Sequence, residues 1–236
     1  MAHLERLGGI RGPILGVMLG CAAASCAPPP PAAQTDARRG VAETTTIEDA
    51  VPEGWSIEQR HDADFNGDGR ADALLLLRSP APADTTPPRM LAVVLGTAEP
   101  GGFTVDATNR ELVPHDPSGR LEDPLADGGI ALGEGGFELT LGMLGGAGSY
   151  EAATMRYGFR YQDGCVRLIR YRRAQTHRAT LATRDLSVDF LTGEVVETTG
   201  NAQSADDETR RTRLQANPRR CLAELPSGWT FDPLTP

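Results

Sequence analysis

The chain has 236 residues, of which 39% are hydrophobic and 23% are charged. Enough apolar side chains are present to form a core, which excludes a generically disordered chain, and the length fits one all-β domain plus a targeting segment. The net charge of −9 at pH 7 argues against nucleic acid as a partner.

Residues 1–26 have the pattern of an export signal, in which two arginines precede an apolar stretch, 13–25, that is too short to span a bilayer. Small residues then lead to Cys26 and a proline-rich segment, an arrangement that resembles a bacterial lipoprotein signal. We therefore expect lipid on Cys26 and a disordered Pro/Ala-rich tether over 27–46. Cys21 is a second candidate for lipidation, and a cleaved, soluble secreted protein is the alternative.

After the tether, the sequence predicts a single β-rich domain over residues 47–236. Its apolar runs are short and are separated by proline or glycine, as is typical of strands. The first third therefore predicts a meander. Its expected strands are 55–65, 71–79, 89–97 and 102–112.

Later strands are expected in pairs around turns that suit positive φ angles. The expected turns are Gly135-Gly136, Asp163-Gly164 and Thr192-Gly193. Only residues 204–216 have a helical pattern, with Ser204 as a cap and Asp/Arg pairs at i, i+4 spacing. The predicted fold is mainly β, a twisted antiparallel meander or sandwich with one short C-terminal helix.

The loop 64–72 follows the pattern D-x-N-x-D-G-x-x-D, which places hard oxygen ligands where they can surround one Ca²⁺. The expected ligands are Asp64, Asn66, Asp68, the backbone carbonyl of Arg70, and Asp72. An EF-hand is excluded, because its twelfth position would need a glutamate and is Leu75 here. The alternative is an ordinary turn without metal, since Asp, Asn and Gly also favour turns.

This loop between two strands resembles the calcium hairpins of FG-GAP and VCBS repeats. Together with "FRYQ" and "DFLTG", in that order within residues 47–198, it also resembles a family of poorly characterised bacterial secreted proteins and lipoproteins. The resemblance implies a β-rich exported domain with no established reaction. Asp189 stands where that family usually has asparagine. A full propeller is excluded, because no second copy of the loop recurs at a fixed period.

Cysteine usage agrees with export. If Cys26 carries lipid and Cys21 leaves with the signal, Cys165 and Cys221 remain as an even pair in an oxidising compartment. We expect a disulfide between them, and two unpaired thiols are the alternative. No Cys/His spacing indicates a zinc site or redox catalysis.

Residues 156–184 contain eight arginines and a single acidic residue. Because side chains alternate along a strand, Arg156 and Arg160 should share one face, as should Arg170 and Arg172 on the next strand. Carboxylates from the acidic first half could cover these arginines. Alternatively, the four form a docking site for an anionic envelope ligand, such as a phosphate- or carboxylate-bearing glycan.

No catalytic signature is present. Ser149 lacks the glycine two residues later that a nucleophile elbow requires, and the histidines show no triad order. The predicted function is therefore that of a non-enzymatic, calcium-binding structural or binding module of the bacterial envelope. It would be lipid-anchored at the outer membrane or in the periplasm and contact an envelope protein or an anionic glycan. An envelope hydrolase acting on glycans through paired carboxylates is the alternative.

Overall fold

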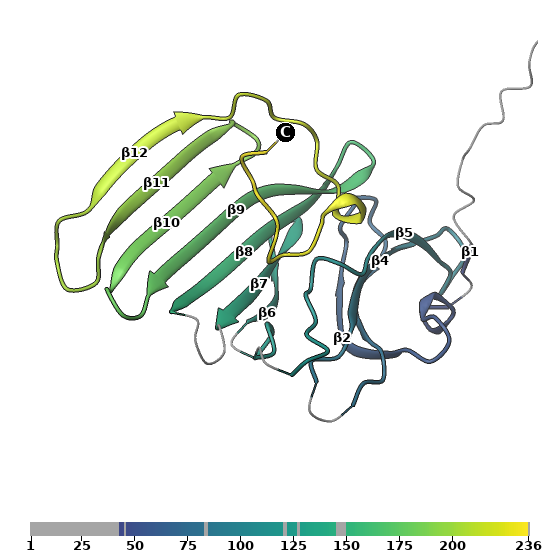
Figure 1. Cartoon of the computed structure of the whole chain (residues 1–236). Helices are drawn as coiled ribbons and strands as arrows, with labels where there is room; N and C mark the ends of the chain where they lie inside the picture. The colour runs from purple at the N-terminus through teal and green to yellow at the C-terminus, as the bar shows by residue number, and fades with distance from the viewer. Residues whose placement is uncertain are drawn as a thin grey trace, which may run out of the picture. The chain divides into compact units, whose positions relative to one another are not determined.

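Two antiparallel sheets make up the β domain (Figure 1). The computed structural model describes residues 43–44, 46–82, 85–119, 122–126, 128–144 and 150–235. The predicted export signal, the lipidation candidates Cys26 and Cys21, and the tether up to residue 42 lie outside the described residues. Within the described part of the chain, no helix has the length and apolarity that crossing a membrane requires.

The first sheet has five strands in the order β1-β5-β4-β3-β2. Its strands are β1 (Glu43–Thr44), β2 (Ser56–Ala63), β3 (Asp72–Arg78), β4 (Arg89–Gly96) and β5 (Phe103–Asn109). The run of four leucines forms most of β3, and all four are fully buried. Leu74 and Leu76 pack into the main core, whereas Leu75 and Leu77 pack on the opposite face under η1 (Glu48–Ala50) and its neighbours. Burial on both faces explains why this strand is continuously apolar.

The second sheet has seven strands in sequence order from β6 to β12. They are β6 (Gly129–Gly133), β7 (Gly136–Leu144), β8 (Glu151–Gln162), β9 (Cys165–His177), β10 (Ala182–Asp189), β11 (Glu194–Asn201) and β12 (Glu208–Arg213). One row of directly paired residues crosses five strands on its core face: Leu139, Tyr157, Tyr171, Val188 and Val195. These five residues share one hydrophobic core with residues of the first sheet, such as Leu74 and Leu91.

The predicted hairpins are confirmed, although the turn between β6 and β7 lies one residue earlier than predicted. Asp163 and Gly164 have φ angles of 53° and 74°, and Gly193 has 74°. The turn between β6 and β7, however, uses Glu134 and Gly135, because Gly136 already pairs within the ladder. A Cβ atom on Gly136 would lie 2.0 Å from the carbonyl oxygen of Phe159, so close strand packing requires glycine there.

The predicted C-terminal helix over 204–216 is wrong. Residues Glu208–Arg213 form β12, an exposed edge strand paired with β11. Arg211, which fitted helical spacing with Asp207, contacts the neighbouring strand instead, with Nη1 3.0 Å from Glu194 Oε1. Helix propensity is a weak preference that an available strand edge readily overrides. The described helical elements are only two short 3₁₀ turns, η1 and η2 (Leu222–Glu224).

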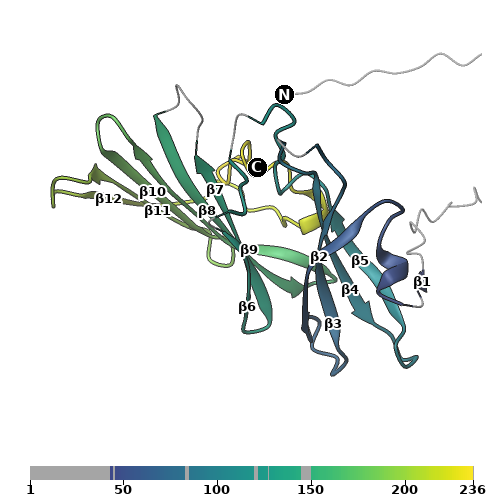
Figure 2. The ribbon, with the colours of Figure 1, turned by 90° about the horizontal axis from the view of Figure 1, so that it is seen from below.

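The C-terminal segment, residues 214–235, lies between the two sheets (Figure 2). Its Leu222, Leu225 and Phe231 are buried in the shared core. The buried side chain of Asn109 in β5 holds it, donating from Nδ2 to the carbonyl oxygens of Leu222 at 2.6 Å and Leu225 at 2.8 Å. The sheets are therefore joined by this segment as well as by direct packing.

A buried ion-pair cluster lies at the start of β4, around Arg89. Arg89, 4% exposed, donates to both carboxylate oxygens of Glu58 at 2.7 and 3.0 Å and to both of Asp123 at 2.8 Å. Burial alone would lower the pKa of Arg89. The hydrogen bonds to Glu58 and Asp123 together have the larger effect, so the pKa lies above its ordinary value. The arginine thereby ties β2 and the loop before β6 to β4.

Candidate functional site

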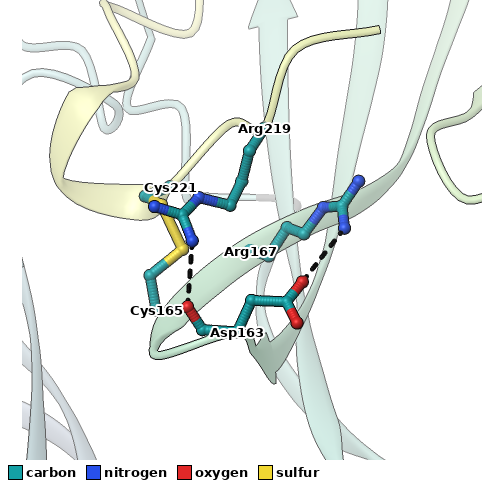
Figure 3. Close-up of a disulfide and its surroundings, with 5 residues drawn as sticks. All are labelled: Asp163, Cys165, Arg167, Arg219 and Cys221. Carbon is teal, nitrogen blue, oxygen red and sulfur yellow. Dashed lines mark hydrogen bonds and ion pairs between the residues drawn. A yellow bond between two sulfur atoms is a disulfide. The ribbon is translucent and has the colours of Figure 1, made fainter.

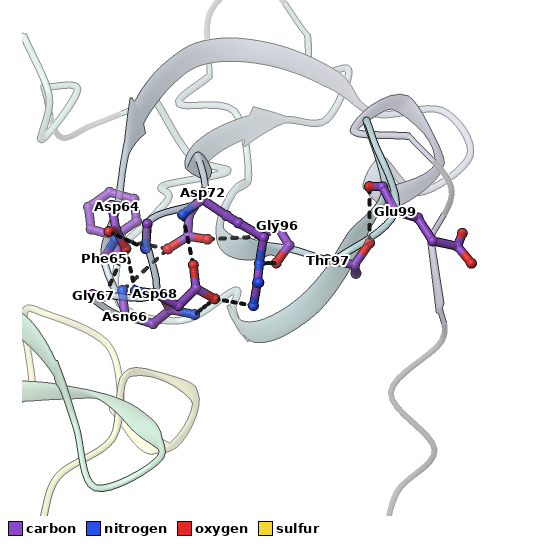
Figure 4. A network of polar contacts seen from close by, with 11 residues as sticks. Asp64, Phe65, Asn66, Gly67, Asp68, Asp72, Gly96, Thr97 and Glu99 are labelled. Carbon is purple, nitrogen blue, oxygen red and sulfur yellow. Dashed lines mark hydrogen bonds and ion pairs between the residues drawn. The ribbon is translucent and has the colours of Figure 1, made fainter.

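The acidic loop winds around the carboxylate of Asp64, directly after β2 (Figure 4). Asp64 Oδ1 accepts hydrogen bonds from the backbone N–H groups of Gly67 at 2.7 Å and Asp68 at 3.1 Å, and Oδ2 accepts from Gly69 at 2.8 Å. Gly67 and Gly69 have φ angles of 76° and 82°, a region that favours glycine. The spacing of glycines in the sequence thus produces the tight winding.

Asp72 is the buried anchor of the loop. It is fully inaccessible to solvent. Its Oδ2 accepts from the backbone N–H groups of Phe65 at 2.8 Å and Asn66 at 3.3 Å, and its Oδ1 accepts from Gly96 at 2.9 Å. One carboxylate therefore joins the loop, the start of β3 and the end of β4, a role that the ninth position of the motif did not reveal.

Asp68 is held by its own neighbours. Oδ1 accepts from the backbone N–H of Arg70 at 2.9 Å, and Oδ2 accepts from Arg70 Nη2 at 2.6 Å and Asn66 Nδ2 at 2.9 Å. The backbone hydrogen bond from Arg70, followed by that from the Asn66 amide, lowers the pKa of Asp68. The guanidinium also donates through Nε to the carbonyl oxygen of Gly96 at 3.0 Å, so Arg70 spans loop and sheet.

The loop carries the oxygen-bearing side chains from which the sequence predicts calcium binding, and its hydrogen bonding is that of a self-contained turn. Every carboxylate oxygen of Asp64, Asp68 and Asp72 accepts at least one N–H donor. Among the described residues, no three acidic, histidine or cysteine side chains gather as a metal-binding group. A carboxylate has about four lone-pair positions, so Asp64 and Asp68 retain acceptor capacity. Calcium binding stays a prediction.

Sequence reasoning missed a further carboxylate near the loop, that of Asp106 in β5. Burial raises its pKa, the hydroxyl of Tyr161 lowers it in part, and the charge of Asp72 raises it again. Asp106 lies at the irregularity where the β4–β5 register shifts between Val93 and Val94. Its position depends on pairing between distant strands, and nothing in the local sequence marks it.

The predicted disulfide between Cys165 and Cys221 is confirmed, with a Cα–Cα distance of 5.9 Å (Figure 3). It links the start of β9 to the C-terminal segment. Arg219 Nη1 donates to the carbonyl oxygen of Asp163 at 2.9 Å, and the backbone N–H of Leu168 donates to Arg220 at 2.9 Å beside it. These contacts hold the C-terminal segment against the β8–β9 hairpin.

The four candidate anion-binding arginines lie on the outer face of the seven-stranded sheet, and Arg156 is directly opposite Arg172. The acidic stretch 41–155 supplies the partner of Arg156, whereas the partner of Arg172 comes from the neighbouring strand β10. Arg172 donates to both oxygens of Asp185 in the neighbouring strand, at 2.6 to 3.1 Å, and Arg156 lies 3.9 Å from Glu138. Within the described part of the chain, Arg160 and Arg170 form no ion pair.

The residues considered for hydrolysis form no described catalytic arrangement. Ser149 lies outside the described residues. His177 accepts at Nδ1 from the backbone N–H of Thr180 at 3.1 Å and stacks on Tyr150 with ring centroids 5.6 Å apart, which is a turn-stabilising role. Comparisons with protein-family models, with curated proteins and with solved structures found no match.

Proposed function

We propose that the protein is a non-enzymatic binding module of the bacterial envelope, exported and held at the membrane by lipid on Cys26. The observation that carries this proposal is the Cys165–Cys221 disulfide. Disulfides form and persist in oxidising compartments and are rare in the cytosol. Together with the signal pattern of residues 1–26, the disulfide favours a domain that works outside the cytoplasm.

Calcium in the acidic loop is part of this proposal. The ion would take oxygens from Asp64, Asn66, Asp68 and the backbone of Arg70, while Asp72 anchors the loop from its buried side. Binding would replace an internal cation, the Arg70 guanidinium, with Ca²⁺. This predicts that Arg70 competes with calcium, which an ordinary calcium loop without that arginine would not show.

The calcium proposal is tested by thermal unfolding of the purified full-length protein in chelator and in calcium. Binding to the folded state adds RT ln(1 + [L]/Kd), about 2.7 kcal/mol at 100 times Kd. We expect Ca²⁺ to raise Tm, Asp68→Ala to abolish the rise and Arg70→Gln to enlarge it. Mg²⁺ should act poorly, because it demands a tighter octahedron and loses its water reluctantly. An unchanged Tm at millimolar calcium contradicts the metal assignment.

The binding role itself is tested by retention of envelope components on the immobilised protein, with and without chelator. An anionic glycan is the partner class that the outer arginine face fits, because a guanidinium binds carboxylate and phosphate groups through paired hydrogen bonds. Arg160→Gln with Arg170→Gln should reduce retention without lowering Tm, since neither residue has an ion pair within the described chain. Absence of any retained component contradicts the proposal.

A further inference from the structure

A cavity of about 330 Å³ lies between the core-facing side of β9 and β10 and the C-terminal segment. It is separate from the acidic loop and from the outer arginine face. The polar residues that line it include Tyr171, Arg173, Gln175, Arg184, Trp229 and Asp232. Phe231, Leu186 and Leu234 supply apolar walls. The cavity therefore combines aromatic surface with polar groups, as small-molecule sites do.

Three unsatisfied donors belong to residues that line this cavity. In the described part of the chain, four buried side-chain nitrogen or oxygen atoms have no hydrogen-bond partner, and three of them are Tyr171 Oη, Arg173 Nε and Trp229 Nε1. Tyr171 is only 2% exposed. Buried polar groups are almost always paired, and an unpaired one costs about 1–3 kcal/mol. Acceptors for these donors must come from water or from a molecule bound in the cavity.

The neighbouring protein acceptors are already in use. Tyr157, whose ring packs against Tyr171, directs its hydroxyl to the carbonyl oxygen of Gly228 at 3.0 Å. Asp232 accepts from the backbone N–H of Leu234 at 2.9 Å and from the hydroxyl of Thr235 at 2.8 Å. Burial raises the pKa of Tyr171, so its hydroxyl stays protonated and able to donate at neutral pH.

The donors define the ligand chemistry. A phenol O–H, an indole N–H and a guanidinium N–H all require acceptor oxygens, and the guanidinium charge favours a carboxylate. The Trp229 ring, which is only partly buried, offers a face on which a sugar ring can pack. We propose that this cavity binds a carboxylated monosaccharide unit, of the uronic acid type, with its carboxylate toward Arg173.

This inference deepens the proposed binding role and rests on it, but it requires neither calcium nor lipid. It adds a second glycan-binding site, on the inner face of β9, to the outer arginine face. Arg173 faces the cavity, whereas the adjacent Arg172 points to the outer face and pairs with Asp185. Arg172 is therefore a matched control for a substitution of Arg173.

The test titrates full-length protein with glucuronate and, separately, with glucose, while the indole N–H signals are followed by NMR. The protein has two tryptophans, and Trp229→Phe assigns the cavity signal. We expect glucuronate to shift the Trp229 signal saturably and leave that of Trp55 unchanged, with glucose at least about tenfold weaker because it lacks the charged acceptor. Arg173→Met should weaken glucuronate binding at least about tenfold, by loss of a charge-assisted hydrogen bond, and Arg172→Met should not.

Several outcomes would overturn the inference. No shift at millimolar glucuronate would mean that water alone fills the cavity, and equal binding of glucose would reject carboxylate recognition. Loss of binding in Arg172→Met with retention in Arg173→Met would move the site to the outer face. Unfolding of Arg173→Met is separated from lost binding by its melt and by Tyr171→Phe, which removes one donor while keeping an aromatic ring and the Trp229 signal. If the proposed binding role itself is wrong, the immobilised unmodified protein will retain no envelope component.

Discussion

Replacement of Asp72 by alanine should destabilise the domain strongly, even without calcium. The substitution leaves the backbone N–H groups of Phe65, Asn66 and Gly96 without their acceptor. The two hydrogen bonds of 2.8 and 2.9 Å contribute most, and the bond of 3.3 Å contributes little. A hydrogen bond to a charged group contributes about 1.5–3 kcal/mol, so the two short bonds together account for about 3–6 kcal/mol of unfolding free energy. For a domain of this size, a loss of about 4 kcal/mol lowers Tm by about 8–16 °C.

The assay is thermal unfolding in excess chelator, so that any metal effect is removed. Asp68→Ala is the matched control, because its carboxylate belongs to the same loop but is exposed, and it should change Tm far less. Asp72→Asn should fall between the two, since one amide oxygen can still accept. A Tm for Asp72→Ala within about 3 °C of the unmodified protein, roughly 1 kcal/mol, would refute the anchoring role.

Three further predictions concern the rest of the domain. Replacing Cys165 and Cys221 together with serine should lower the unfolding free energy by about 4 kcal/mol, measured in urea, because the disulfide closes a loop with a sequence separation of 56; an unchanged midpoint would reject this. Arg89→Met should cost about 3 kcal/mol, since it leaves two partly buried carboxylates unpaired, and a near-neutral effect would contradict the cluster. Burial would raise the pKa of Asp123, but hydrogen bonds from Arg89 outweigh it and hold the pKa below its ordinary value. Its stabilising contribution is therefore full above about pH 4, the unfolded value, and is lost as pH falls through the lower folded pKa. It should shrink in the pH–stability curve of Arg89→Met, in which the backbone N–H of Leu125 at 3.0 Å still donates to Asp123.

The local sequence was enough to predict most strands and turns. Alternation of apolar residues marks one buried face, and Asp163-Gly164 marks a tight turn, because both depend on the conformations of adjacent residues. The disulfide also followed from counting, since only Cys165 and Cys221 remained for an oxidising compartment. The acidic loop was recognisable for the same local reason, as its glycines and aspartates wind around each other within a few residues.

What sequence alone determined, then, are features whose partners lie nearby in the chain, whereas tertiary structure decided every feature whose partner is distant. Residues 204–216 have helical charge spacing, but the free edge of β11 made residues 208–213 a strand. Asp72 became an anchor because pairing of β3 with β4 brought Gly96 to its carboxylate. The cavity needs Arg173 and Trp229, which only the fold of the C-terminal segment over β9 brings together. Such contacts depend on which segments pack together, a choice made by burial of the whole core and not by neighbouring residues.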